Sequence, residues 1–111
     1  MATTYKTLGQ VESTGTISTY DTLYTVPADT ATVVSNIVVC NRSASAQYFR
    51  ISCSDTTTPD NAEFIAYGTA VPANDSIPLV IGLTLDTTVK YLMCSATSSE
   101  VSFSAFGAET T

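Results

Sequence analysis

One stretch near the middle of the chain decides the fold, and it runs Thr32-Val33-Val34-Ser35-Asn36-Ile37-Val38-Val39-Cys40. Most of its residues are β-branched, and such side chains fit a pleated, half-buried sheet better than a helix. Residues typical of turns lie on both sides, at Pro27-Ala28-Asp29 and at 41–46. The stretch therefore predicts a strand over 32–40 with a turn at each end.

The same pattern recurs along the whole chain, because turn residues interrupt β-rich runs roughly every 8 to 14 residues. Neither the apolar spacing of an amphipathic helix nor a fixed repeat is present. About eight short strands, each with one apolar face, predict an all-β fold in which residues 1–111 form a single antiparallel β-sandwich, jelly-roll or Ig-like. The expected strands are 5–12, 17–26, 32–40, 47–53, 63–67, 76–81, 89–96 and 101–106.

The apolar alternation predicts two hairpins, each with one inward face on both strands. In the hairpin 89–96 with 101–106, the expected pairs are Ala96 with Val101, Cys94 with Phe103, and Leu92 with Ala105. In the hairpin 32–40 with 47–53, they are Val39 with Phe49, Ile37 with Ile51, and Ser35 with Cys53. The alternative register of the second hairpin would bury Asn36 without a partner, which costs about 1–3 kcal/mol.

The cysteines and one proline add local expectations. Cys94 faces the core, whereas Cys40 and Cys53 lie on opposite faces about 15 Å apart, too far for a disulfide. Three cysteines without a CxxC spacing therefore predict free thiols. Pro78 lacks a backbone donor and is expected at a sheet edge or bulge, with Ile77, Leu79 and Ile81 pointing inward around it.

The charge balance argues against two classes of partner. Four Lys and Arg residues oppose ten Asp and Glu residues, which gives a net charge of −6. An acidic domain repels phosphate backbones and anionic lipids, so neither a nucleic acid nor a membrane is expected as a partner. The start of the chain carries no apolar run of signal-peptide length, so synthesis and folding in a cytoplasm are expected.

The sequence offers no catalytic centre that we can defend. It contains no histidine, which removes Ser-His-Asp and Cys-His arrangements. The three cysteines have no zinc-site spacing, and the five glycines are isolated rather than grouped in a phosphate-binding loop. A paired-carboxylate site needs a deep cleft that a chain this short can scarcely build. We therefore expect no enzyme and assign no catalytic, metal-binding or cofactor-binding residue.

Two sets of residues could still form a binding site. Loop oxygens that could bind calcium are Asp55, Asp60, Asn61 and Asp75, but their spacing matches no calcium loop and turn roles are favoured. The tyrosines are spread over six segments without a local cluster, at Tyr5, Tyr20, Tyr24, Tyr48, Tyr67 and Tyr91. Most are expected to pack on the sheets with the hydroxyl at the surface, and some to anchor a protein interface.

The surface composition suggests packing against neighbouring proteins. Thr and Ser make up roughly three residues in ten, while only 13% of residues are charged. Charged residues are depleted at interface centres because desolvating them costs several kcal/mol each. The polar ends, 1–4 and 109–111, are short arms that could clasp a neighbouring subunit, although frayed termini are the simpler expectation.

Several segments together resemble a known family of proteins. They are Thr25-Val26-Pro27-Ala28, Val33-Val34-Ser35-Asn36-Ile37-Val38-Val39-Cys40-Asn41, Phe49-Arg50-Ile51, Pro72-Ala73-Asn74-Asp75-Ser76, Gly82-Leu83-Thr84-Leu85 and Val101-Ser102-Phe103-Ser104-Ala105-Phe106-Gly107. From about Gln10 to Glu109 the chain resembles small β-sandwich virion structural proteins of tailed bacteriophages, which are either capsid decoration (cement) proteins or tail-associated proteins.

This resemblance implies a part of a virion, assembled in the bacterial host cytoplasm. It favours a decoration protein that bridges subunits of the major capsid protein. Such a protein is a homo-oligomer, most often a trimer, and its binding free energy comes from many modest interfaces. The alternative is a tail, baseplate or fibre component that contacts host glycans through exposed tyrosines and loop carboxylates. A free carbohydrate-binding module is disfavoured because the chain has neither tryptophan nor a secretion signal.

Overall fold

The computed structural model describes residues 2–111 and contains eight strands with one short 3-10 helix. Every expected strand is present, with ends shifted by a few residues. The elements are β1 (Thr3–Glu12), β2 (Asp21–Thr25), β3 (Ala31–Asn41), β4 (Gln47–Ser54), η1 (Asn61–Glu63), β5 (Phe64–Val71), β6 (Asp75–Leu85), β7 (Tyr91–Ala96) and β8 (Val101–Thr110). Within residues 2–111, no helix is long and apolar enough to span a membrane.

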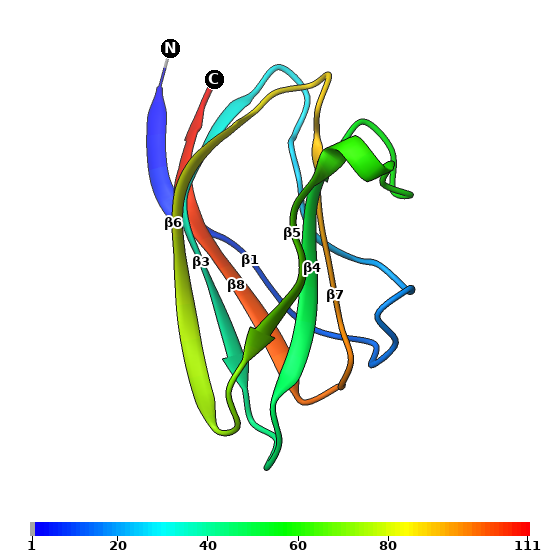
Figure 1. Ribbon diagram of the computed structural model, residues 1–111. Helices are drawn as coiled ribbons and strands as arrows, with labels where there is room; N and C mark the ends of the chain where they lie inside the picture. Colours follow the sequence, from blue (N-terminus) through cyan, green and yellow to red (C-terminus); the bar gives the residue numbers. More distant parts are fainter. Residues whose placement is uncertain (1) are drawn as a thin grey trace.

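The strands form two four-stranded antiparallel sheets that face each other (Figure 1). The first sheet has the order β1-β8-β3-β6 and the second has the order β2-β7-β4-β5. The pairs β4–β5, β3–β6, β2–β7 and β1–β8 are nested around the β4–β5 connection, as in a long hairpin rolled up on itself. This nesting defines a jelly roll and decides between the two sandwich types that the sequence left open.

Both expected hairpins are wrong as pairings, although most residues expected on their inward faces do face the core. Ser35, expected inward opposite Cys53, is exposed because the register of β3 shifts between Val34 and Asn36. β7 pairs with β2 and β4, whereas β8 pairs with β1 and β3, so the loop between β7 and β8 crosses from one sheet to the other. β3 and β4 are separated in the same way. Buried as expected are Ile37, Val39, Phe49, Ile51, Leu92, Cys94, Ala96, Val101, Phe103 and Ala105.

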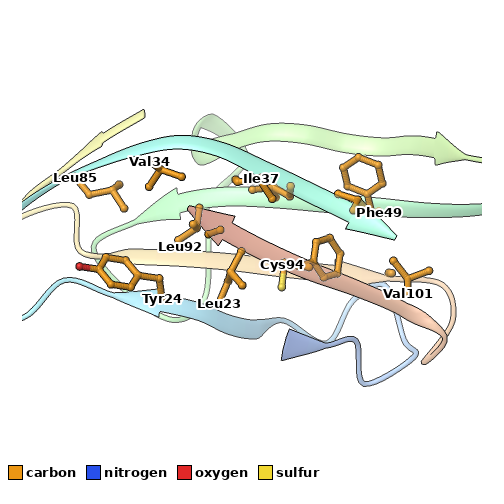
Figure 2. Close-up of a cluster of buried hydrophobic side chains, with 14 of the residues drawn as sticks. Leu23, Tyr24, Val34, Ile37, Phe49, Leu85, Leu92, Cys94 and Val101 are labelled. Carbon is orange, nitrogen blue, oxygen red and sulfur yellow. The ribbon is translucent and has the colours of Figure 1, made fainter. Parts of the chain in front are cut away.

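The core fills the space between the two sheets (Figure 2). Phe49 of β4 and Phe103 of β8 meet edge to face across the layers, with ring centroids 6.1 Å apart. Both side chains are fully buried, and each such side chain contributes roughly 1.5–3 kcal/mol by leaving water. The three thiols are free: Cys94 is buried in this core, while Cys40 and Cys53 are partly buried.

One end of the sandwich is held by a polar cluster that joins the layers. Tyr24 of β2 donates its hydroxyl hydrogen bond to the carboxylate of Glu109 on β8 and lies 2.9 Å from the Thr32 hydroxyl on β3. Lys6 of β1 forms an ion pair with Glu109 at 3.1 Å. Burial and the Glu109 carboxylate raise the pKa of Tyr24 to about 12, so the phenol stays protonated as a donor.

The two chain ends are strands rather than arms. Thr3 pairs with Thr110 and Thr4 with Glu109, and the backbones of Ala2 and Thr111 exchange hydrogen bonds of 3.1 and 2.9 Å. Met1 lies outside the described residues. These hydrogen bonds between the two ends extend the β1–β8 ladder.

For the edge strand β6, the expected position of Pro78 is confirmed and the expected orientation of Ile81 is wrong. Pro78 lies on this edge, where a missing donor is tolerated, as expected. Ile77 and Leu79 pack against the core, but Ile81 is 42% exposed. The register of β6 against β3 shifts between Val34 and Asn36, and this irregularity turns Ile81 away from the interior.

Candidate functional site: an uncharged face and an aromatic corner

The outer face of the first sheet carries an uncharged surface that we call the uncharged face. It is built from three rows of paired residues that run across all four strands. The rows are Tyr5-Ala108-Val33-Thr84, Thr7-Phe106-Asn36-Val80 and Gln10-Ser104-Val38-Pro78. Buried residues of β3 and β8 alternate with these rows, and partly buried neighbours on β1 and β6, such as Leu8 and Leu79, pack against the core. The pleat therefore directs the rows away from the core.

Several apolar side chains of the uncharged face are open to solvent. Tyr5 is 84% exposed, Val80 is 79% exposed and Val33 is 45% exposed. A charged residue is reached only in the next row, where Glu12 pairs with Ser102, and Glu12 is bound by Arg42. Exposed apolar groups grouped on a flat sheet without charges are typical of a surface that contacts another protein.

The outer face of the second sheet carries a different feature, which we call the aromatic corner. Phe64 and Tyr67 of β5 meet edge to face, with ring centroids 4.9 Å apart and an angle of 78° between the rings. Residues three apart in a regular strand would point to opposite faces. The register of β4 against β5 skips Ile65 and Gly68, and the irregularity at Ile65 brings both rings to one side.

Arg50 of β4 contacts two of the aromatic side chains at this corner. Its guanidinium lies 4.0 Å from the centre of the Tyr67 ring, close enough for a cation–π interaction. It also donates a 2.9 Å hydrogen bond to the hydroxyl of Tyr20, whose ring lies 5.8 Å from that of Phe64. Arg50 is in neither of the ion pairs found within residues 2–111, and its Nε is buried without a hydrogen-bond partner.

The corner borders a shallow hollow with a volume of about 460 Å³, lined by Asn61, Phe64 and Tyr67. That volume lies in the range of small-molecule sites, roughly 300–1,000 Å³. Tyr67 is 60% exposed, so part of its ring is available to a ligand. The amide of Asn61, at the start of η1, supplies a polar group at the rim.

The remaining tyrosines have separate locations. The tyrosines form no local cluster along the chain, but the fold brings Tyr20 and Tyr67, 47 positions apart, into contact with the same side chain, Arg50. Tyr5 lies on the uncharged face, and Tyr24 is buried at the polar cluster described above. Tyr48 is 47% exposed on β4, and Tyr91 of β7 has the Lys90 ammonium 5.3 Å from its ring.

The loop oxygens considered for calcium do not come together. Asp55, Asp60 and Asn61 precede β5, whereas Asp75 follows it at the opposite end of the sandwich, about 26 Å away along eight strand residues (Figure 1). Among residues 2–111, no three acidic or cysteine side chains are grouped closely enough to hold a metal ion.

These loop residues instead take part in local turns. Asp60 donates its backbone N–H to Glu63, whose carboxylate also accepts from Ser54, and these hydrogen bonds lower the pKa of Glu63. Asp75 accepts a 2.8 Å hydrogen bond from the backbone of Ser76.

Comparisons with known proteins identify the fold. No protein family matches the sequence, and no curated protein matches it. Among solved structures, the chain is similar to one in the T13 viral particle of IBDV, with a TM-score of 0.55, 15% identity and coverage of 97% of this chain and 30% of that one. A chain of the Gx strain of infectious bursal disease virus gives a TM-score of 0.50, 12% identity and coverage of 97% and 31%.

A bacteriophage protein of similar length is also among the similar structures. A chain in the capsid asymmetric unit of cyanophage Pam1 has a TM-score of 0.51 and 15% identity, with 96% of this chain and 83% of that one covered. By contrast, the chain spans less than a third of each of the two other viral chains. At these identities the likeness establishes the fold alone, a jelly roll of the kind found in viral capsids.

Proposed function

We propose that this chain is a non-enzymatic structural protein of a bacteriophage virion, most specifically a capsid decoration protein that binds subunits of the major capsid protein. The observation that carries the proposal is the uncharged face, because a broad surface without charged side chains on an otherwise acidic domain is suited to binding another protein. The jelly roll and its similarity to viral capsid chains support a place in the virion.

The size of the face supports a specific contact. The three rows span about 20 Å along the strands and about 19 Å across them, so the uncharged face covers about 400 Å². A standard protein interface buries about 800 Å² on each partner, so the uncharged face could form the centre of one, with the surrounding residues as its rim. A protein of charge −6 meets an acidic neighbour with least repulsion through a surface that carries no charge of its own.

The Pam1 chain that shares the fold comes from a capsid asymmetric unit, and this chain covers 83% of it. This similarity supports a place at the capsid. Within this proposal, the protein forms trimers at symmetry axes, and repeated modest contacts supply its hold on the lattice.

Gold labelling tests the position on the particle. Purified particles of the virus that encodes this chain are labelled with an antibody to the protein and viewed by electron microscopy. Gold spread over the head is expected. Gold confined to the tail contradicts decoration and assigns the chain to the tail, baseplate or fibre.

A matched pair of variants tests the surface. Val80→Lys places a charge in the middle of the uncharged face, where an unpaired buried ion costs several kcal/mol, so occupancy on particles lacking the protein should fall at least tenfold. Val89→Lys, at a residue 38% exposed between β6 and β7, is the control and should bind normally. Equal binding by both variants would show that the face is not the contact.

A further inference from the structure

The strand that carries the aromatic corner is locally irregular. Two skipped residues in β5 flank Tyr67, at Ile65 and Gly68, and Gly68 has a positive φ of 70°. An added Cβ at Gly68 would meet nothing within 4 Å, so the space beside it is open. Irregularities of this kind commonly re-aim side chains at functional sites. Here they direct two aromatic rings outward instead of burying them.

The supporting side chains hold the corner in one shape before any ligand arrives. Arg50 is fixed between the Tyr67 ring and the Tyr20 hydroxyl, and Tyr20 in turn packs on Phe64. These contacts connect the loop before β2 with β4 and β5. A rigid site loses little conformational entropy on binding, which favours affinity for a small ligand.

We propose that the aromatic corner binds a saccharide ring. A pyranose has a face of C–H groups and a rim of hydroxyls, and the site has the matching groups. The exposed Tyr67 ring offers a flat apolar surface for the C–H face, Phe64 forms a wall at 78° to it, and Asn61 offers both a donor and an acceptor to the hydroxyls. This site is on the second sheet, whereas the uncharged face is on the first, so the proposal does not depend on the proposed attachment to the shell.

Other ligands fit the corner less well. A nucleotide would also stack on the rings, but the nearby cation, Arg50, is already held by Tyr67 and Tyr20, and the chain as a whole has a charge of −6. A purely apolar ligand would make no use of the Asn61 amide beside the rings. A flat protein surface could not enter a hollow of about 460 Å³, whereas one or two sugar rings could.

Saturation-transfer NMR tests the proposal with the full chain. The probes are millimolar glucose, galactose, mannose and N-acetylglucosamine, together with dextran, mannan and chitin oligosaccharides, so that chain ends and internal sugars are compared. At least one probe should receive saturation from the wild-type protein. The signal should fall at least tenfold in Tyr67→Ala and persist in Tyr67→Phe, which keeps the ring.

The control variant is Tyr48→Ala, because Tyr48 is a similarly exposed tyrosine on β4 that makes none of the corner contacts. It should bind the sugar as the wild type does. Tyr67 is exposed, so Tyr67→Ala should remain folded, which a thermal melt verifies. The proposal is overturned if no probe binds the wild type, or if Tyr67→Ala binds as well as Tyr48→Ala. Loss of particle occupancy in Tyr67→Ala without sugar binding would instead identify the corner as a protein contact.

Discussion

Replacing Asn41 by alanine should remove a large part of the stability of this protein. Asn41 ends β3 and is 1% exposed. Its amide nitrogen donates to the carbonyls of Ser45, Val71 and Pro72 at 2.9, 3.2 and 3.1 Å, and its oxygen accepts from the backbone and hydroxyl of Ser43 at 2.9 and 2.7 Å. One side chain thus ties the β3–β4 connection to the β5–β6 turn.

The expected magnitude follows from these contacts. The amide has two N–H groups, so three acceptors share two protons, and the two accepted bonds bring the total to four full hydrogen bonds. At a net value of about 1 kcal/mol each, their loss costs about 4 kcal/mol. A domain of this size has a stability of about 5–15 kcal/mol, so Asn41→Ala should lose between about a quarter and four-fifths of it.

Urea unfolding followed by circular dichroism measures this difference. The control is Asn36→Ala, because Asn36 is partly exposed on the uncharged face and its side chain forms no hydrogen bond within residues 2–111. The control should lose less than about 1 kcal/mol. A loss below about 1 kcal/mol in Asn41→Ala, with an unchanged dependence on urea, would refute the hydrogen-bond reasoning.

Two further predictions concern the first sheet. Gly107→Ala should lower the melting temperature more than Gly68→Ala, because a Cβ at Gly107 would lie 1.9 Å from the backbone oxygen of Val33. At Gly68 a Cβ meets open space, so alanine there costs only the strain of the positive φ, about 1–2 kcal/mol. Equal melting temperatures would contradict the β3–β8 register. Hydrogen bonds from Tyr24 and Lys6 lower the pKa of Glu109, so its contribution to stability is present above the unfolded pKa and is lost as pH falls through the lower folded value. The stability difference between wild type and Tyr24→Phe should therefore shrink between pH 7 and pH 3 in urea unfolding, and a constant difference would show that Glu109 is not the partner of Tyr24.

The uncharged face shows what composition alone can predict about the surface. The scarcity of charge predicts a surface that contacts other proteins, and the structure places uncharged rows side by side on one sheet. The sequence could not assign those rows, because they depend on which strands are neighbours. Tyr5 and Val80 lie far apart in the chain and share a face only because β8 and β3 stand between β1 and β6.

Local preference and alternation by themselves determined the strands and most of the inward residues. Ser35 and Ile81, expected inward, are exposed where the register of β3 against β6 shifts. Side chains alternate along a strand whatever its partner, so Phe49, Cys94 and Phe103 are assigned to the core without knowledge of the pairing. Only the tertiary structure decided which strands pair, because a loop such as 97–100 can close a hairpin or cross to the opposite sheet with the same residues. The aromatic corner was also decided only by the tertiary structure, because an irregular strand register brings Tyr20, Arg50 and Tyr67 together. Irregularities that depend on neighbouring strands leave no periodic signal in the sequence.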